Sequence, residues 1–383
     1  MVTVKRLSIC LVAPTLDFPT GPGPAHHVRR LARSLAQRAD VTVACRRMRA
    51  SALDEPFTLA PFNPDTDDGD SSETIPSLST LDRFAERRLP GFDVVLESSW
   101  LHSGRVSSWC ASRGIPAVSV IGQVPASRTW LAHDRSSRYL RRAPLVVAET
   151  AELRGAIADR WKIPLGRIEL IEPGVDREVF HPRDQADARA RLGLAQDQKI
   201  LLYVGALDRG HDLAPVVEAV DRVGDPALRL HVIGDGPARA ELERRAMRGG
   251  AVTFHGWLPE VPTFIAAADL CLALDDSRPA SDCVGGYSMQ AVREYLASGR
   301  PVALASDGPK PGLVRHLVSG FLLKHQLLDW IQFLQRECPS RNSLRLMGEA
   351  AAATPIPSVE AAAEAYLSLC LRLRGPRQVS AVG

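Results

Sequence analysis

The sequence predicts an α/β protein made of two doubly wound domains, each built around a parallel sheet. The chain has 383 residues, which is too long for one ordinary core and suits two domains of about 150–200 residues each. Short apolar, β-branched runs alternate with segments of helical periodicity in both halves, a pattern typical of parallel sheets covered by helices on both faces. A segment with proline at both ends, residues 173–182 (PGVDREVFHP), is predicted to link the halves.

In the first half, residues 6–13 (RLSICLVA) are predicted to form a buried strand, and a loop follows them. Residues 25–38 carry apolar side chains at helical spacing, namely Val28, Leu31, Leu35 and Ala36. Further strands are expected at residues 41–45, 92–96, 116–121 and 145–148. The polar run at residues 65–74 (DTDDGDSSET) is predicted to be a surface loop.

The second half repeats this plan, with strands expected at residues 199–204, 228–233, 251–254, 270–274 and 301–305. A final helix at residues 359–374 follows two prolines and is expected to pack back on the domains. We therefore divide the chain into a first domain at residues 1–175, a second domain at residues 176–355, and a C-terminal helix and tail at residues 356–383.

Bulk properties exclude several classes of protein. A net charge of +3 is too small to indicate a nucleic-acid-binding protein. The seven cysteines include no C-x-x-C pair, so neither a zinc site nor a disulfide framework is expected. Since no apolar run approaches the ~18 residues that span a bilayer, and no signal peptide is recognised, we expect a cytoplasmic protein.

In doubly wound sheets, ligands bind at the carboxyl ends of the strands, beside helix N-termini. Two such domains in tandem predict a ligand in a cleft between them. In the first domain, Gly21 and Gly23 precede a helix that starts with His26 and His27. The missing G-x-G-x-x-G fingerprint disfavours a dinucleotide oxidoreductase. One histidine is expected to point toward the cleft, although a tight turn with two surface or packing histidines remains the alternative.

In the second domain, residues 201–210 (LLYVGALDRG) place a strand, Gly205 and then Arg209 before a helix. A cation at Arg209 would neutralise a diphosphate leaving group without a metal. A solvated surface arginine is the alternative. Residues 228–237 (LRLHVIGDGP) form another strand with a glycine-rich exit, for which a simple turn is the favoured interpretation.

Residues 285–300 (GGYSMQAVREYLASGR) are the most informative segment. A helix is predicted to begin near Ser288, so the backbone N–H groups of Ser288, Met289 and Gln290 would face an anion. Glu294 lies about one and a half turns further along this helix, where a carboxylate would accept hydrogen bonds from a ribose diol. The alternative is an ordinary helix residue in an ion pair.

Charged clusters elsewhere support weaker hypotheses. Two acidic pairs fit an Asp-x-Asp metal clamp only loosely, and we predict no metal site there: Asp65 with Asp67, and Asp68 with Asp70. Asp275 and Asp276 end a strand and are candidates for contact with a sugar. Four arginines would suit an acidic acceptor or a peripheral membrane contact with anionic lipid, and a solvated helix face is the alternative. They are Arg135, Arg138, Arg141 and Arg142.

The chain resembles the family-four retaining glycosyltransferases of the GT-B fold, in which two Rossmann-like domains face each other across a cleft. The resemblance runs from the N-terminal glycine turn through Phe321. It depends on five segments that occur in the family's order: residues 171–182, 203–210, 230–236, 252–259 (VTFHGWLP) and 294–302 (EYLASGRPV).

The resemblance implies that the second domain binds a UDP- or GDP-sugar and the first domain an acceptor. Glu294 would bind the ribose and Arg209 the diphosphate, both as catalytic residues. Further donor-binding positions would be Gly205, the backbone of Gly286, Ser288, Met289 and Gln290, and, beside the base, Trp257 and Leu258. The acceptor side would include Gly23, His26, His27 and Gln123.

The activity implied is transfer of a sugar, with retention and without a metal or resident cofactor, to a small-molecule, lipid-linked or glycan acceptor. Such a reaction would serve natural-product or cell-envelope glycoside synthesis. Three positions depart from the family pattern: Gly286 stands where a glutamate is frequent, Ala206 where an arginine is usual, and Gln123 where a histidine is expected. A non-catalytic GT-B relative and another two-Rossmann enzyme, such as an epimerase or phosphorylase, remain alternatives.

Overall fold

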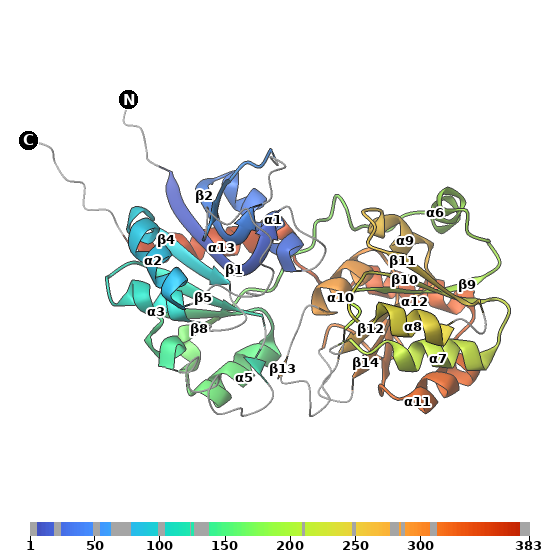
Figure 1. The fold of residues 1–383 in the computed structure, drawn as a ribbon. Helices are drawn as coiled ribbons and strands as arrows, with labels where there is room; N and C mark the ends of the chain where they lie inside the picture. The colour runs from blue at the N-terminus through green and yellow to red at the C-terminus, as the bar shows by residue number, and fades with distance from the viewer. Residues whose placement is uncertain are drawn as a thin grey trace, which may run out of the picture. The chain divides into compact units, whose positions relative to one another are not determined.

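The computed structural model describes residues 6–18, 24–48, 54–62, 78–98, 104–122, 124–125, 138–208, 211–246, 250–275, 283–284, 288–306 and 312–375. The chain divides into two compact units (Figure 1). The first unit comprises Met1–Gly174 with Pro357–Gly383, and the second comprises Val175–Ile356. The C-terminal helix therefore belongs to the same unit as the N-terminal strands.

The first unit contains a seven-stranded parallel sheet with the order β3-β2-β1-β4-β5-β7-β8. Its strands are β1 (Leu7–Phe18), β2 (Ala39–Met48), β3 (Thr58–Pro61), β4 (Val94–Ser98), β5 (Ala117–Ile121), β7 (Leu145–Ala148) and β8 (Ile168–Leu170). Its helices are α1 (Pro24–Ala36), α2 (Leu78–Arg88), α3 (Arg105–Ala111), α5 (Ala151–Trp161) and α13 (Val359–Arg374), and β6 (Val124–Pro125) is a two-residue strand.

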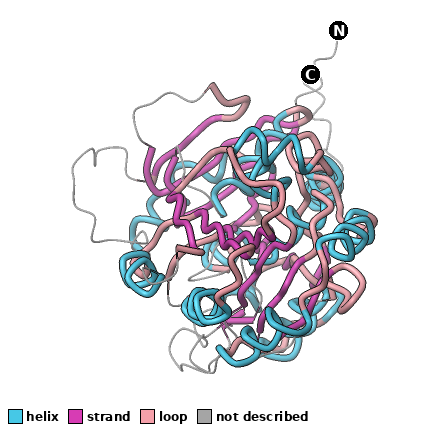
Figure 2. Tube along the Cα trace, turned by 90° about the vertical axis from the view of Figure 1, so that its right-hand side faces the viewer, coloured by secondary structure: helices cyan, strands magenta, loops and turns pink. Residues whose placement is uncertain are grey.

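Successive residues of β1 point to opposite faces of this sheet, because side chains alternate along a strand. Ile9 and Leu11 pack in a cluster with residues of α1 and α13, whereas Cys10 and Val12 pack with residues of α2 and α3. Helices thus cover both faces (Figure 2), which explains why these strands read as continuous apolar runs.

The second unit contains a six-stranded parallel sheet with the order β11-β10-β9-β12-β14-β15. Its strands are β9 (Lys199–Val204), β10 (Leu228–Ile233), β11 (Val252–Gly256), β12 (Leu270–Asp275), β14 (Val302–Ser306) and β15 (Gly320–Leu323), with the two-residue β13 (Cys283–Val284). Its helices are α6 (Gln185–Leu192), α7 (Ala214–Val223), α8 (Arg239–Ala246), α9 (Val261–Ala267), α10 (Ser288–Ala297), α11 (Leu327–Gln332) and α12 (Arg341–Ala352).

The two faces of this second sheet are also both covered. Leu201 and Tyr203 of β9 pack with α7, α8 and α11, while Ile200 and Leu202 pack with α9 and α10. In each sheet the second and third strands lie on one side of the first strand, and the later strands lie on its other side. This strand order is typical of doubly wound sheets. The predicted fold class is confirmed.

Helix α13 has its own N-terminal cap and is joined to the rest of the first unit by two ion pairs. The Ser358 side chain caps its N-terminus by accepting a hydrogen bond from the Ala361 N–H at 3.2 Å. Glu364 pairs with Arg38, and the Arg372 guanidinium donates to Glu169 at 2.8 Å. The helix packs along α1, so its apolar residues complete the core on that face of the sheet.

Candidate functional site

In the second unit, the loops that follow three neighbouring strands are joined by backbone hydrogen bonds. The Gly205 N–H after β9 donates to the Ile233 carbonyl at 3.0 Å. The Gly234 N–H after β10 donates to the Gly256 carbonyl, at the end of β11, at 2.8 Å. Gly205 and the Gly256–Trp257 corner therefore lie along one edge of the sheet, the edge where doubly wound domains bind ligands.

The glycine-rich exit of β10 serves this close approach of backbones. Gly234 has φ +145°, and a Cβ atom there would lie 1.8 Å from the Gly205 carbonyl oxygen. Gly236 has φ +156°, and its Cβ atom would lie 2.2 Å from the Leu207 carbonyl oxygen. Both positions need glycine for packing reasons alone, which agrees with the interpretation of this segment as a turn.

Helix α10 is tied to the end of β9 by a buried side chain. The Tyr295 hydroxyl accepts a hydrogen bond from the Val204 N–H at 3.0 Å, and Tyr295 is fully buried. Burial raises the pKa of this phenol well above its ordinary value, so it stays protonated. The second half of α10, which carries Tyr295, is consequently held at the carboxyl end of β9.

Four predicted donor-binding residues lie on α10: Ser288, Met289, Gln290 and Glu294. The Met289 side chain is buried in the core of the unit, so only its backbone can face a ligand. A helix leaves the N–H groups of its first turn without intrahelical partners, so the N-terminus of α10 has the kind of backbone geometry that an anion site uses. The Glu294 carboxylate is partly exposed and accepts a hydrogen bond from the Gln290 amide at 3.3 Å.

The predicted base-binding residues follow β11 directly. Trp257 is 51% exposed, an unusual state for a large aromatic side chain that lies beside a core strand. Leu258 is partly buried and packs against the core cluster that contains Met289. The indole therefore offers an open aromatic face at the same edge of the sheet as Gly205.

Several predicted residues lie outside the described parts of the structure. These are Gly23, Gln123, Arg209, Gly286, Arg135, Asp276 and the acidic loop with Asp65, Asp67, Asp68 and Asp70; for His26, Ser288 and Asp275 only the backbone is described. Among the residues with described positions, no group of three or more His, Cys, Asp or Glu side chains is placed to hold a metal ion. No described helix is both long and apolar enough to cross a membrane.

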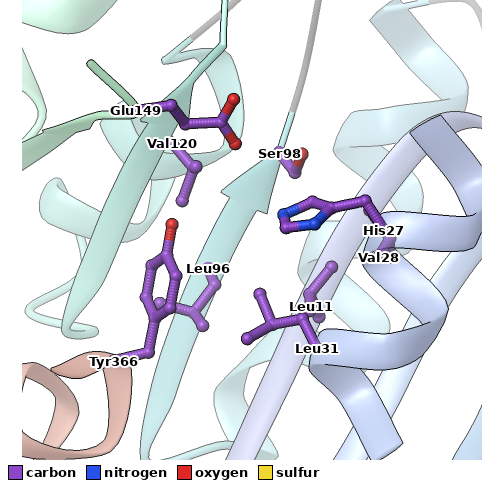
Figure 3. Close-up of a pocket in the computed structure, with 9 residues that line it drawn as sticks. All are labelled: Leu11, His27, Val28, Leu31, Leu96, Ser98, Val120, Glu149 and Tyr366. Carbon is purple, nitrogen blue, oxygen red and sulfur yellow. The ribbon is translucent and has the colours of Figure 1, made fainter. Parts of the chain in front are cut away.

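In the first unit, His27 lines a small cavity at the carboxyl edge of the sheet (Figure 3). The floor is apolar and comes from β1, β4, β5 and α1. Three further polar side chains reach the cavity: Ser98 at the end of β4, Glu149 directly after β7, and Tyr366 on α13. The structure thus supports a cavity-lining position for His27 and adds three residues that the sequence analysis did not single out.

The three added residues differ in whether the sequence alone could have identified them. Ser98 and Glu149 are polar residues at the ends of predicted strands, a pattern that could have identified them. Tyr366 carries no such signal, because only the tertiary structure shows that α13 returns to the first unit.

A buried carboxylate near this edge, Glu97, has a structural role. Glu97 in β4 accepts hydrogen bonds from the N–H groups of Val106 and Ser107, at 3.2 and 2.9 Å, and so satisfies the start of α3. Burial raises the pKa of Glu97, while these N–H groups oppose the shift. The segment before α3 turns at Gly104, with φ +85°, where a Cβ atom would lie 2.8 Å from Leu140.

Comparison with known proteins matches both units. The family model described as Glycosyltransferase Family 4 matches residues 22–179, and the one described as Glycosyl transferases group 1 matches residues 198–335. The D-inositol 3-phosphate glycosyltransferase of Nocardia farcinica is 28% identical over 306 residues, covering 72% of this chain and 66% of that protein. The chain spans between 62% and 66% of the length of the first three such relatives, which is less than two thirds.

Solved structures share the fold over almost the whole chain. Sucrose-phosphate synthase from Thermosynechococcus elongatus superposes with a TM-score of 0.73 at 20% identity, covering 95% of this chain and 98% of that chain. Anabaena HepE, in a complex with UDP-glucose, superposes with a TM-score of 0.71 at 17% identity, covering 94% and 98%. With two glycosyltransferase models matched in succession and this shared architecture, the chain belongs to the family-four glycosyltransferases of the GT-B fold.

Proposed function

We propose that this protein transfers a sugar from a UDP- or GDP-sugar to a hydroxyl group of a small-molecule, lipid-linked or glycan acceptor, with retention and without a metal ion. One observation carries the proposal. The loops after β9, β10 and β11 lie at one edge of the second sheet, and α10, which carries Glu294, is tied through Tyr295 to the end of β9 at that edge. A UDP-glucose complex of the same fold supports a nucleotide-sugar donor.

The chemistry follows from the charges that develop as the donor reacts. The bond between the anomeric carbon and the diphosphate oxygen breaks, and a bond from the anomeric carbon to the acceptor oxygen forms on the same face. The acceptor proton ends on the leaving diphosphate. The N-terminus of α10, which carries partial positive charge, and Arg209 would stabilise the negative charge on that leaving group.

The ribose and then the base of the donor would extend from one side of this phosphate site, and the sugar from the other. Trp257 offers an exposed ring beside Gly256, suited to stacking on a base. Glu294 offers a carboxylate for the ribose hydroxyls, and the Gln290 amide already holds one of its oxygens. Both flank the glycine loops, so the same edge would bind the whole nucleotide.

The acceptor would bind to the first unit. His27 supports this assignment because its ring faces the cavity at the carboxyl edge of the first sheet (Figure 3). The relative from Nocardia farcinica is named as a glycosyltransferase of D-inositol 3-phosphate, which is a polyhydroxyl compound. A polyhydroxyl acceptor is therefore the class that we propose for this chain.

A non-catalytic GT-B protein is the second candidate, favoured by Ala206, which is exposed and carries no charge where the family usually has arginine. Nucleotide release from UDP- and GDP-sugars, measured with and without a panel of polyhydroxyl acceptors, tests the main proposal. An active enzyme releases nucleotide faster when its acceptor is present. A thermal shift with UDP or GDP but no turnover with any acceptor would favour the non-catalytic candidate, and the absence of both would contradict nucleotide-sugar binding altogether.

A further inference from the structure

The cavity of the first unit combines an apolar floor with a polar rim. Five apolar side chains form the floor and are all at least 90% buried: Leu11, Val28, Leu31, Leu96 and Val120. The polar groups come from four separate parts of the first unit and border the same cavity (Figure 3). They are His27 on α1, Ser98 on β4, Glu149 after β7 and Tyr366 on α13.

The size of the cavity limits what can enter it. Its volume of about 20 Å³ exceeds the ~10–15 Å³ that one water molecule requires but is too small for a phosphate group. A single polar heavy atom with its hydrogen, such as a hydroxyl, fits this space. The apolar floor can offer such a group no hydrogen bond, so its partners must come from the rim.

Glu149 occupies a position that depends on the absence of a side chain opposite. A Cβ atom at Gly122 would lie 2.7 Å from Glu149 Oε2, so the carboxylate lies directly over this glycine. The Glu149 N–H donates to the Ile121 carbonyl at 3.3 Å, which continues the pairing of β5 and β7. The carboxylate is thus held at the end of two core strands.

Tyr366 brings a hydrogen-bond donor to the same cavity. Its ring is 3% exposed, and its hydroxyl points toward Val120 and the Glu149 carboxylate (Figure 3). Burial, together with the negative charge of Glu149, raises the pKa of the phenol well above its ordinary value. The hydroxyl therefore keeps its proton and remains a donor at every physiological pH.

We propose that this cavity is a subsite for one hydroxyl group of a polyhydroxyl acceptor, with Glu149 accepting the hydrogen bond of that hydroxyl and Tyr366 donating to its oxygen. The proposal rests on the proposed function, which it deepens by naming acceptor-binding residues. The subsite selects an uncharged part of the acceptor, because the Glu149 carboxylate repels anions and the cavity excludes a phosphate. Since Tyr366 lies on α13, the subsite needs both ends of the chain.

Binding of myo-inositol to the full chain in the presence of UDP tests the subsite directly, by saturation-transfer NMR or calorimetry. We expect Glu149→Gln to weaken myo-inositol binding at least tenfold, and Tyr366→Phe to weaken it roughly threefold to tenfold, as for loss of a charged and a neutral hydrogen bond. Gly122→Ala, which displaces the carboxylate without removing it, should give an intermediate loss. The matched control Glu152→Gln, at the exposed first turn of α5, should leave binding unchanged.

UDP affinity, measured separately on every variant, keeps this test distinct from that of the proposed function. If wild-type protein binds UDP but not myo-inositol at tens of millimolar, the subsite is wrong while the donor site stands. Equal binding of myo-inositol by the wild type and Glu149→Gln would also overturn the subsite. So would D-inositol 3-phosphate binding more tightly than myo-inositol, with an affinity that Glu149→Gln leaves unchanged. No binding of UDP or GDP to the wild type would instead contradict the proposed function.

Discussion

The Tyr295 hydroxyl and the Val204 N–H form a buried hydrogen bond of 3.0 Å that joins helix α10 to the carboxyl end of β9. The same hydroxyl is 3.4 Å from the Val204 carbonyl, so it satisfies both backbone groups of the last residue of the strand. This contact fixes the second half of α10 against the carboxyl end of β9.

Tyr295→Phe should destabilise the second unit by about 1–3 kcal/mol, because the Val204 N–H would stay buried without a partner. This corresponds to a fall in melting temperature of roughly 2–12 °C, measured by circular dichroism. Tyr203→Phe is the matched control, since its hydroxyl donates to the carbonyl of the exposed Ala206, which water can reach. A larger effect from Tyr203→Phe than from Tyr295→Phe would contradict this account.

The stability of the second unit should also depend on a pair of histidines. His231 Nδ1 lies 2.8 Å from His255 Nε2, and the two rings stack beside Phe264. Burial, the neighbouring His255 and the charges of Arg229 and Arg189 lower the pKa of His231 from 6.5 to about 4. Between these values the unfolded chain binds more protons than the folded chain, so stability falls as the pH drops through this window.

We expect the free energy of unfolding to decrease by on the order of 2 kcal/mol between pH 7 and pH 5, as the size of the shift implies. His231→Phe should lose clearly less over the same range, because it removes the more strongly shifted group. Urea melts at several pH values provide the measurement, with His181→Gln as a control at an exposed histidine. Identical pH profiles for wild type and His231→Phe would rule out the histidine pair as the cause.

Sequence patterns identified the central strands well because these are buried on both faces. Residues 199–204 and 228–233 were predicted as strands, and they form β9 and β10 with the same bounds. Apart from the two-residue strands β6 and β13, the strands that were not predicted are β3, β8 and β15. All three lie at the edges of their sheets. An edge strand pairs on one side only, so it can be short and mixed in composition, and its register comes from its neighbour.

In the candidate site, too, local features could be predicted from the sequence, whereas contacts between distant residues could not. The start of α10 followed from local signals, since a glycine pair before an amphipathic helix marks a helix N-terminus. The link between Tyr295 and Val204 and the entry of Tyr366 into the first unit did not, because both join residues distant in sequence. Length and composition predict that α13 is a helix, yet only packing against α1 determines which unit it completes.

Catalysis should survive excess chelator, since the proposed charge stabilisation comes from Arg209 and the N-terminus of α10 rather than from a metal ion. The measurement is nucleotide release with and without EDTA after exhaustive dialysis. Full activity in the chelator is the expected result. Complete loss of turnover that manganese or magnesium restores would show that the leaving group is stabilised by a metal.

The last prediction concerns Glu294, whose carboxylate is partly exposed and accepts from the Gln290 amide at 3.3 Å. If this carboxylate accepts hydrogen bonds from both ribose hydroxyls, Glu294→Gln keeps the size of the side chain but removes the charge that strengthens those bonds. The change is worth on the order of 1–2 kcal/mol, or a loss of nucleotide affinity of roughly fivefold to thirtyfold.

Calorimetry with UDP and 2′-deoxy-UDP on both proteins separates a ribose contact from a general effect on the helix. Wild-type protein should prefer UDP, and this preference should shrink in Glu294→Gln, because the variant has lost the contact that senses the 2′-hydroxyl. Glu349→Gln on α12, an exposed carboxylate paired with Arg345, serves as the matched control and should bind both ligands like the wild type. If the wild type binds the two nucleotides equally, Glu294 is a structural helix residue and the ribose of the donor must be recognised elsewhere.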